Sequence, residues 1–222
     1  MSSIINPDLI NASFLIELIV GISLSVASGF RVFVPLLILS IVGVAGWFDF
    51  PPDFDWLETP QTLGLFAIAS TLEIIGYSVP WVDNLLDTLS TPIAIIAGTL
   101  VTLSFTQGIN PMLDWTLAIV AGGGAAGLTK GLMNLLRATS TATSGGLTNP
   151  VVAAMELIVA TVMTLLALTL PILAAFLGVA VLGLALGIFA KLWTGLRRKK
   201  KRRTSDSFAE ELRERSRERV RK

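Results

Sequence analysis

The sequence predicts an all-α protein, a polytopic transmembrane helical bundle with about six spans. Two observations support this fold class. Of the 222 residues, 53% are hydrophobic and only 15% are charged, whereas soluble domains carry roughly a quarter charged residues. The apolar residues also form long runs between proline-rich and polar segments, as helices that cross about 30 Å of hydrocarbon require. We therefore expect a multi-pass protein of a cell membrane, in a bacterium the inner membrane, with the lipid bilayer as its surroundings.

Charge is distributed unevenly along the chain. Residues 197–222 hold 13 of the 17 Lys and Arg residues and 5 of the 16 acidic residues, so residues 1–196 are net acidic. The basic segment directly follows an apolar run, and the positive-inside rule places it in the cytoplasm. We predict a transmembrane domain over 1–196 and a basic, partly helical cytoplasmic tail over 197–222, which can contact anionic lipid. No nucleic-acid partner is expected, because nothing resembling a reading element accompanies the charge.

The chain contains no Cys and no His. These absences exclude disulfides, thiolate and imidazole chemistry, and most zinc or haem ligation. The glycine-rich stretch GGGAAG lies within an apolar run and lacks the Gly-Lys-Ser/Thr of a phosphate-binding loop, so helix packing explains it better. We predict that the protein is not an enzyme and uses no cofactor or metal.

The first apolar run, about residues 14–46, is unusually long and contains a basic residue. Its 33 residues would form a helix of roughly 50 Å, longer than one straight span needs. We predict a break or kink at Ser28-Gly29. Arg31 follows, and a guanidinium at the bilayer centre costs about 2.5–3.5 kcal/mol by insertion scales. Arg31 must therefore face a protein interior or an interface.

A proline-rich segment over 47–60 follows and carries four acidic residues between aromatic ones. It is predicted to be an interfacial loop, with an acidic funnel for cations as the alternative. The remaining spans are predicted at about 62–79, 92–105, 113–137, 151–170 and 171–193. Six spans would place the N-terminus in the cytoplasm and the 47–60 loop outside.

Small residues form ladders that favour close helix contact. The members are Gly21, Ser25 and Gly29 in the first run, Gly123, Gly127 and Gly131 in the fourth span, and Gly183 and Gly187 in the last. Each of the first two ladders is followed or accompanied by a basic residue, then by a span with a glutamate, then by a proline-led segment (LSTPI, 89–93; LTLPI, 168–172). This order suggests a 3+3 inverted repeat over about 12–108 and 113–193. The ladders can pack within one chain or between protomers, which leaves a homo-oligomer open.

Three stretches, SGFRVFVPLL (28–37), STLEIIGYSVPWVDNLLDTLSTP (70–92) and LTNPVVAAME (147–156), resemble a bacterial family of multi-span membrane proteins that carries a domain-of-unknown-function label. The resemblance covers roughly residues 12–190. It implies the same multi-span fold, and it implies no activity. The signature positions that it implies are Arg31, Glu73, Pro80, Asp83, Lys130, Arg137, Asn149, Pro150 and Glu156.

Two functional hypotheses follow from the intramembrane charges. In the first, the protein is a transporter or channel for a small ion or polar solute, and polar residues at the repeat interface line its path. The candidate path residues are Arg31, Glu73, Asp83, Asp87, Lys130, Arg137, Asn149 and Glu156. In the second, the charges form structural ion pairs in a non-transporting membrane scaffold or lipid-binding protein. A pair of carboxylates four residues apart, such as Asp83 and Asp87, is by itself a weak signal for a cation site.

Overall fold

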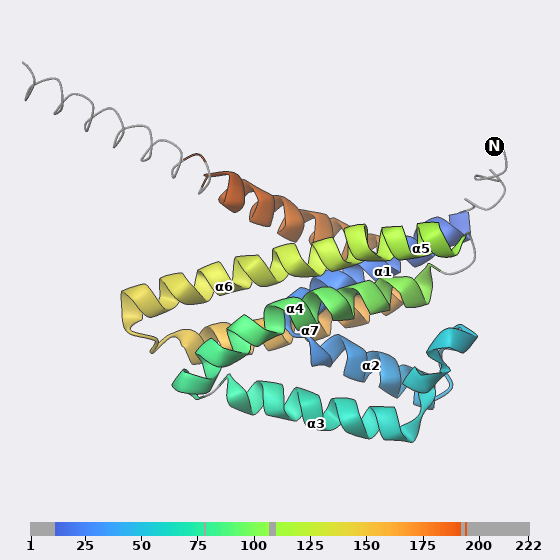
Figure 1. The fold of residues 1–222 in the computed structure, drawn as a ribbon, viewed down its shortest axis with the longest axis horizontal. Coiled ribbons are helices and arrows are strands. Elements are labelled where there is room, and N and C mark those ends of the chain that lie inside the picture. Colours follow the sequence, from blue (N-terminus) through green and yellow to red (C-terminus); the bar gives the residue numbers. More distant parts are fainter. Residues whose placement is uncertain (1–11, 78, 107–109, 192–193, 195–222) are drawn as a thin grey trace, which may run out of the picture. The chain divides into compact units, whose positions relative to one another are not determined.

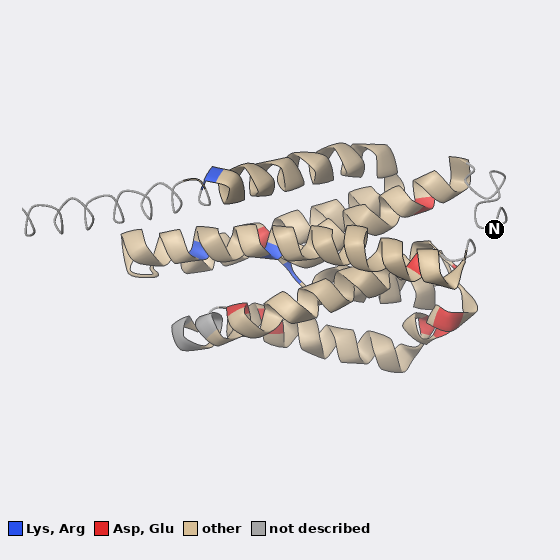
Figure 2. Ribbon diagram, turned by 45° about the horizontal axis from the view of Figure 1, so that its top comes forward, with Lys and Arg blue, Asp and Glu red and all other residues tan. Residues whose placement is uncertain are grey.

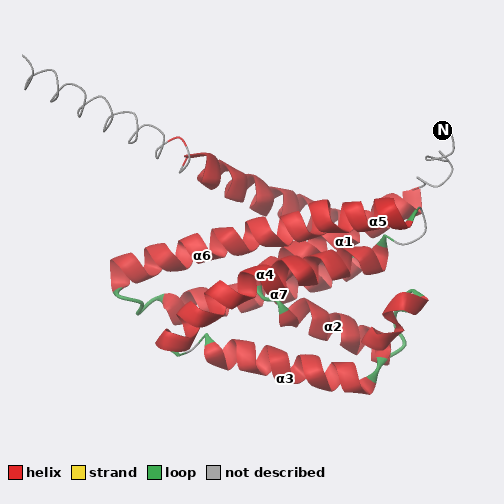
Figure 3. Ribbon diagram, in the orientation of Figure 1, coloured by secondary structure: helices red, strands yellow, loops and turns green. Residues whose placement is uncertain are grey.

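A computed structural model describes residues 12–77, 79–106, 110–191 and 194. These residues form helices joined by short loops and contain no strand (Figure 3). The chain divides into two compact units, Met1–Gly183 and Leu184–Lys222, and the charge cluster described below lies in the first. The predicted basic tail over 197–222 lies outside the described residues.

The helices follow one another in a simple order (Figure 1). Their bounds are α1 Ala12–Phe30, α2 Phe33–Val44, the 3₁₀ helix η2 Pro52–Glu58, α3 Pro60–Gly76, α4 Pro80–Phe105, α5 Pro111–Leu117, the π-helical segment η3 Ala118–Gly123, α6 Gly124–Ser144 and α7 Asn149–Thr169. A further helix covers Pro171–Lys191.

Five helical segments in the described part of the chain are long and apolar enough to cross a membrane. They are Ala12–Phe30, Leu85–Phe105, Pro111–Ser144, Asn149–Thr169 and Pro171–Lys191. The protein is therefore a multi-pass membrane protein by the hydropathy of its helices. About six spans were predicted; the span expected over 62–79 corresponds to α3, which has 17 residues and is not among the five.

Prolines and capping side chains set the helix starts. A proline fits the first turn because the amide N–H that it lacks would have no partner there. Pro60 and Pro111 stand at such positions, each after a capping residue: Thr59 accepts a hydrogen bond from the Thr62 N–H (3.3 Å), and Asn110 accepts one from the Met112 N–H (2.9 Å). Gly145, with a φ of +64°, ends α6 in the left-handed region.

The first apolar run is broken, as predicted, but three residues later than expected. Helix α1 continues through Ser28 and Gly29 to Phe30, and the break falls at Arg31 and Val32. After the break the chain turns back, so that α2 returns towards the end of the bundle where α1 begins (Figure 1). One pocket is lined by Glu17 from α1 and by Trp47, just beyond α2, which places both ends together.

The α1–α2 pair is thus a hairpin whose tip lies inside the bundle, which answers the question of whether the run is one continuous helix. The 12 residues of α2 span only about 18 Å. The beginning of α1 and the 47–60 segment lie at one end, whereas six successive crossings would have separated them. Ser28 and Gly29 do not interrupt the backbone hydrogen bonds of α1. The break lies instead where a buried cation and a capping carboxylate meet the helix ends, as described below.

Pro92 lies inside α4 and does not begin a helix, which corrects the predicted span over 92–105. Helix α4 already begins at Pro80, whose missing N–H costs nothing in the first turn. The helix continues for 26 residues with Pro92 on its exposed side. An internal proline loses one backbone hydrogen bond, a loss that membrane helices tolerate when neighbouring groups satisfy the freed carbonyl.

Helices α1, α4 and α6 meet along their small residues. A methyl group added at Gly29 would lie 2.4 Å from Thr129 Cβ, and one at Gly122 would lie 2.6 Å from the Gly98 carbonyl oxygen. Ser25 adds polar contacts across the same seam, donating to the Gly98 carbonyl (2.7 Å) and lying 2.8 Å from Thr102 Oγ1. Backbones this close require glycine, and the seam fixes where the charged residues at its end are placed.

The other ladder residues lie in different surroundings. Gly21 faces Thr102, whereas Gly123 and Gly127 face Ile95 and its neighbours on α4. Gly131 is partly buried. A methyl group at Gly183 or Gly187 would meet no atom within 4 Å in the described part of the chain.

The geometry of the seam bears on the predicted repeat. Thr102 is close to both Gly21 and Gly122, and Gly29 is close to Ala126 and Thr129. Helices α1 and α6 therefore run in the same direction, with α4 antiparallel to both. An inverted repeat requires its first elements to run in opposite directions, so the two ladders do not correspond in that way.

Candidate functional site: a buried charge cluster

The tip of the α1–α2 hairpin brings a carboxylate to a helix end. Glu73, on α3, accepts hydrogen bonds from the Val32 N–H (3.0 Å, to Oε1) and the Phe33 N–H (3.2 Å, to Oε2). Helix α2 begins at Phe33, so these amides are among the first-turn donors that lack a partner within the helix. The positive end of the helix dipole stabilises the negative charge. Glu73 therefore caps the helix that begins after the break.

Arg31 occupies the break itself and is 2% exposed. Its guanidinium donates to the carbonyl oxygens of Ala153 on α7 (2.8 Å) and of Glu73 (3.4 Å). Its Nε atom lies 3.7 Å from Oε2 of Glu156. The charge that was difficult to place in a bilayer thus faces a protein interior, where carbonyls and a carboxylate surround it.

Arg137 and Glu156 form the tightest pair in the cluster. The Arg137 Nε donates to Glu156 Oε1 (3.0 Å), and its Nη2 donates to Oε2, so that the contact is bidentate. Each residue is 2% exposed. Because Glu156 also faces Arg31, this carboxylate joins the two guanidinium groups and connects α7 with both α1 and α6.

Tyr77 lies at the centre of the basic residues. The guanidinium carbons of Arg31 and Arg137 lie 4.2 and 4.0 Å from the centre of its ring, within cation–π range. Lys130 donates to the Tyr77 hydroxyl (2.8 Å), which also lies 3.2 Å from Ser90 Oγ. This side chain is the only tyrosine in the sequence, and it contacts each of the three basic residues that precede Lys191.

Asp87 connects the buried cluster with the surface. Its carboxylate lies 3.5 Å from Lys130 Nζ and 3.8 Å from Arg137 Nε, and its side chain is 17% exposed. It lines a polar cleft of about 780 Å³. The other residues lining the cleft are Thr88, Thr91, Asn134, Arg137, Ala138, Thr141, Ala142 and Asn149.

The amide of Asn134 leaves one acceptor unused in this cleft. Its Nδ2 donates to Thr91 Oγ1 (3.0 Å), whereas its buried Oδ1 has no hydrogen-bond partner among the described residues. Asn149, at the rim, accepts from Ser140 (2.7 Å) and donates to Thr141 (3.1 Å). The polar groups that line the cleft are therefore hydroxyls, amides, one carboxylate and the buried guanidinium of Arg137.

The structure brings six of the eight predicted path residues into one cluster: Arg31, Glu73, Asp87, Lys130, Arg137 and Glu156. Asn149 lies at the mouth of the cleft. The side chain of Asp83 lies outside the described part of the structure. Figure 2 shows these charges in the half of the unit away from the acidic segment at η2.

Sequence reasoning missed Tyr77 and Asn134. Tyr77 stands four residues after Glu73, on the same face of the chain, and that spacing was a usable signal. Asn134 lies between Lys130 and Arg137 at helical spacing, so all three share a face of α6. Both are uncharged, and a search for intramembrane charges passes over them.

Comparison with protein families gives one match. The family model of DUF4126, described as a domain of unknown function, matches residues 18–191. The chain belongs to the DUF4126 family. The match includes every residue of the cluster and the whole α1–α2 hairpin from residue 18, so the site lies within the DUF4126 domain. No curated protein and no solved structure matches the chain.

Proposed function

We propose that this DUF4126 protein is a membrane transporter or channel for a small ion or polar solute, with the charge cluster as its central polar site. The observation that carries the proposal is the hairpin tip inside the bundle. There the end of α1 and the start of α2 meet Arg31 and Glu73 beside a polar cleft. Secondary transporters commonly build solute sites from such interrupted helices, because helix ends offer unpaired polar groups inside a membrane.

The cleft would supply the route to the cluster, because two cluster members, Asp87 and Arg137, line it. The Asp87 carboxylate lines the cleft and lies 3.5 Å from Lys130 Nζ, which is longer than a strong hydrogen bond. This carboxylate is held less firmly than Glu73 and Glu156, each of which accepts two hydrogen bonds at 3.2 Å or less. We propose Asp87 as the group that a solute meets first.

The orientation follows from the basic tail. The positive-inside rule places residues after 197 in the cytoplasm. Pro171 lines the cavity at the end of the first unit where Trp47 and Phe105 lie, and the helix that it begins has 21 residues, enough to cross a membrane. We propose that this end faces outward and that the Asp87 cleft faces the cytoplasm.

An inverted repeat is not needed for this proposal. Helix α3 runs from the η2 end towards the cluster, and α7 runs from the cleft back to that end, so the two glutamate-bearing helices are antiparallel. Their relation supports an inverted repeat for these helices, whereas the parallel ladders of α1 and α6 oppose it for the whole halves. A topology-reporter scan of the helix ends tests the proposed directions.

Flux measurements test the transport proposal. Purified protein would be reconstituted into vesicles and assayed for Na⁺, K⁺, Cl⁻ and proton movement. We expect flux of at least one ion, with Glu73→Gln and Asp87→Asn lowering it tenfold or more and exposed Asp55→Asn leaving it unchanged. Unchanged flux in both cluster variants would remove these carboxylates from the mechanism.

One observation favours a second function, a non-transporting membrane scaffold. The Arg137–Glu156 pair is bidentate and buried, which suits an interhelical clamp. This alternative predicts no flux for any ion of the panel. It also predicts that exchanging the pair, Arg137→Glu with Glu156→Arg, restores the stability that either single change removes. The Arg31 and Glu73 pair suits this swap less well, because Glu73 binds backbone amides.

A further inference from the structure

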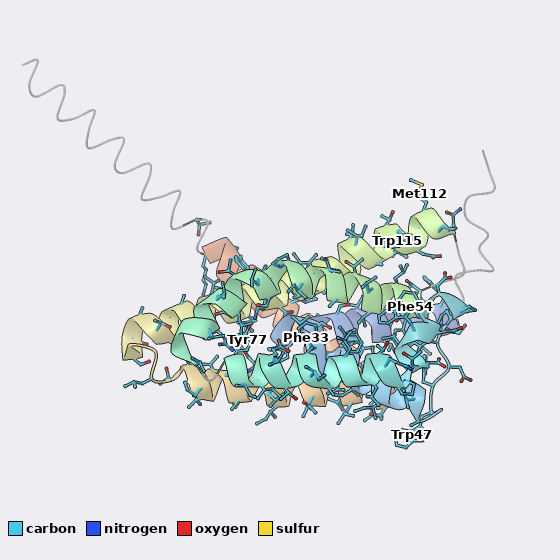
Figure 4. All side chains as sticks on the ribbon, turned by 60° about the horizontal axis from the view of Figure 1, so that its bottom comes forward. Phe33, Trp47, Phe54, Tyr77, Met112 and Trp115 are labelled. Atoms are coloured by element: carbon cyan, nitrogen blue, oxygen red, sulfur yellow. The ribbon has the colours of Figure 1, made fainter. Side chains whose placement is uncertain are left out.

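A second cavity lies at the opposite end of the first unit from the cluster. It has a volume of about 650 Å³, within the range of small-molecule sites. Residues from the start of α1, the segment after α2, the end of α4 and the end of α7 line it. Figure 4 shows Trp47 and Phe54 at this end and Tyr77 towards the other.

Aromatic rings form much of the wall. The ring centres of Phe48 and Phe50 lie 4.9 Å apart, and those of Phe48 and Phe105 lie 5.3 Å apart. Trp47 also lines the cavity and is 79% exposed. Aromatic faces carry negative partial charge, so a cavity of this kind favours cations over anions.

Two carboxylates, Glu17 and Asp49, line the same cavity. Both are exposed, and within the described residues neither takes part in a hydrogen bond or an ion pair. Among the described residues, no basic side chain lines the cavity. The first unit has three basic residues in its sequence, and all three belong to the cluster around Tyr77. Within the described part of the first unit, the cavity therefore combines two unpaired carboxylates with aromatic and aliphatic walls.

We propose that this cavity binds a water-soluble organic monocation, an ammonium group that carries an apolar substituent. The ammonium group would lie near Glu17 and Asp49, and the substituent would pack against the phenyl rings and the aliphatic side chains of Val20 and Leu168. A bare divalent ion fits less well, because the described residues contain no group of three or more metal-ligating side chains. This inference does not depend on the transport proposal.

The charges also favour a soluble cation over a lipid headgroup. The ammonium of a zwitterionic lipid is a few bonds from a phosphodiester, whose negative charge would then lie close to Glu17 and Asp49. Anionic lipids are disfavoured for the same reason. A free ammonium compound gains the attraction without this repulsion.

Equilibrium dialysis of the full chain in an uncharged detergent tests the proposal. The probe is radiolabelled tetraethylammonium, with benzylammonium, benzyl alcohol and benzoate as competitors. We expect saturable binding that benzylammonium displaces at least tenfold better than benzyl alcohol, with no displacement by benzoate. Glu17→Gln and Asp49→Asn should each weaken binding about fivefold. Trp47→Ala should weaken it about threefold, and Trp47→Phe less.

Asp55→Asn is the matched control, because Asp55 is an exposed carboxylate near the same end that does not line the cavity. It should change the affinity less than twofold, since solvent and salt screen charges at longer range. Three results would overturn the proposal. One is the absence of saturable binding, and another is equal displacement by benzyl alcohol. The third is a loss in Asp55→Asn equal to that in Asp49→Asn. Binding that only added phosphatidylethanolamine displaces would assign the cavity to a lipid instead.

Discussion

The two ends of the first unit both gather charged side chains, but they hold them in opposite ways. Around Tyr77, Arg31, Lys130 and Arg137 are nearly inaccessible to solvent, and each contacts a carboxylate, a carbonyl or a hydroxyl. At the other end, Glu17 and Asp49 are exposed, and neither has a partner among the residues that the structure describes. Water can solvate the exposed carboxylates, whereas the buried basic side chains are surrounded by protein atoms. Burial, more than charge itself, therefore determines whether a charged side chain is paired.

The largest effect is expected from removing one member of the tightest pair. Arg137→Ala would leave Glu156 buried beside a single guanidinium and should lower the free energy of unfolding by about 3–5 kcal/mol. Arg137→Lys should restore only part of this loss, because an ammonium cannot form the bidentate contact. Urea titration of the protein in detergent micelles measures both. Asp49→Asn, at the other end, should change the free energy of unfolding by less than about 0.5 kcal/mol. Equal losses in Arg137→Ala and Asp49→Asn would contradict the difference between buried and exposed charges.

A somewhat smaller loss is expected where backbones meet next to the hairpin tip. In Gly29→Ala, the new methyl group would lie 2.4 Å from Thr129 Cβ, so α1 and α6 must separate. We expect a loss of about 1–3 kcal/mol, the usual range for overpacking.

Gly64→Ala in α3 is the control for this substitution, because its methyl group meets no atom within 4 Å. It should stabilise the protein slightly, by up to about 1 kcal/mol, since alanine favours helix. Thermal unfolding followed by circular dichroism compares the two. Similar melting temperatures for Gly29→Ala and the parent protein would contradict the close contact.

The smallest of the expected losses concerns the hydroxyl of Tyr77. Tyr77→Phe keeps the ring beneath the guanidinium groups but leaves the Lys130 ammonium without its 2.8 Å hydrogen bond. We expect a loss of about 1–2 kcal/mol. Tyr77→Leu, which also removes the ring, should cost more because the cation–π contacts are lost as well. A leucine variant no less stable than the phenylalanine variant would show that the ring contributes only volume.

Composition and hydropathy predicted the fold class and the membrane location, since long apolar runs with few charges have one stable environment. Ion pairing among the intramembrane charges was one of the two hypotheses that the sequence left open. The sequence did not predict which partners, because Glu73 binds backbone amides that become available only where the helix breaks.

The hairpin could not be predicted from the sequence for a related reason. An apolar run of 33 residues is compatible with a kinked span or with two half-helices, and the turn at Arg31 and Val32 depends on partners 41 and 122 positions away. Pro92 shows the same limit, because its effect depends on whether a helix has already begun at Pro80. The caps at Thr59 and Asn110, by contrast, are local, because each side chain accepts a hydrogen bond from an amide two or three residues later.

Cysteine labelling tests whether the charge cluster is reached through the cleft that Asp87 lines, because the chain has no cysteine of its own. Single substitutions Thr91→Cys, in the polar cleft, and Asp49→Cys, at the acidic end, would be labelled with a membrane-impermeant thiol reagent in sealed vesicles of known orientation. Buried Ala126→Cys is the unreactive control. We predict that Thr91→Cys and Asp49→Cys react from opposite faces of the membrane. Labelling of both from the same face, or no labelling of Thr91→Cys, would contradict a cluster reached through that cleft.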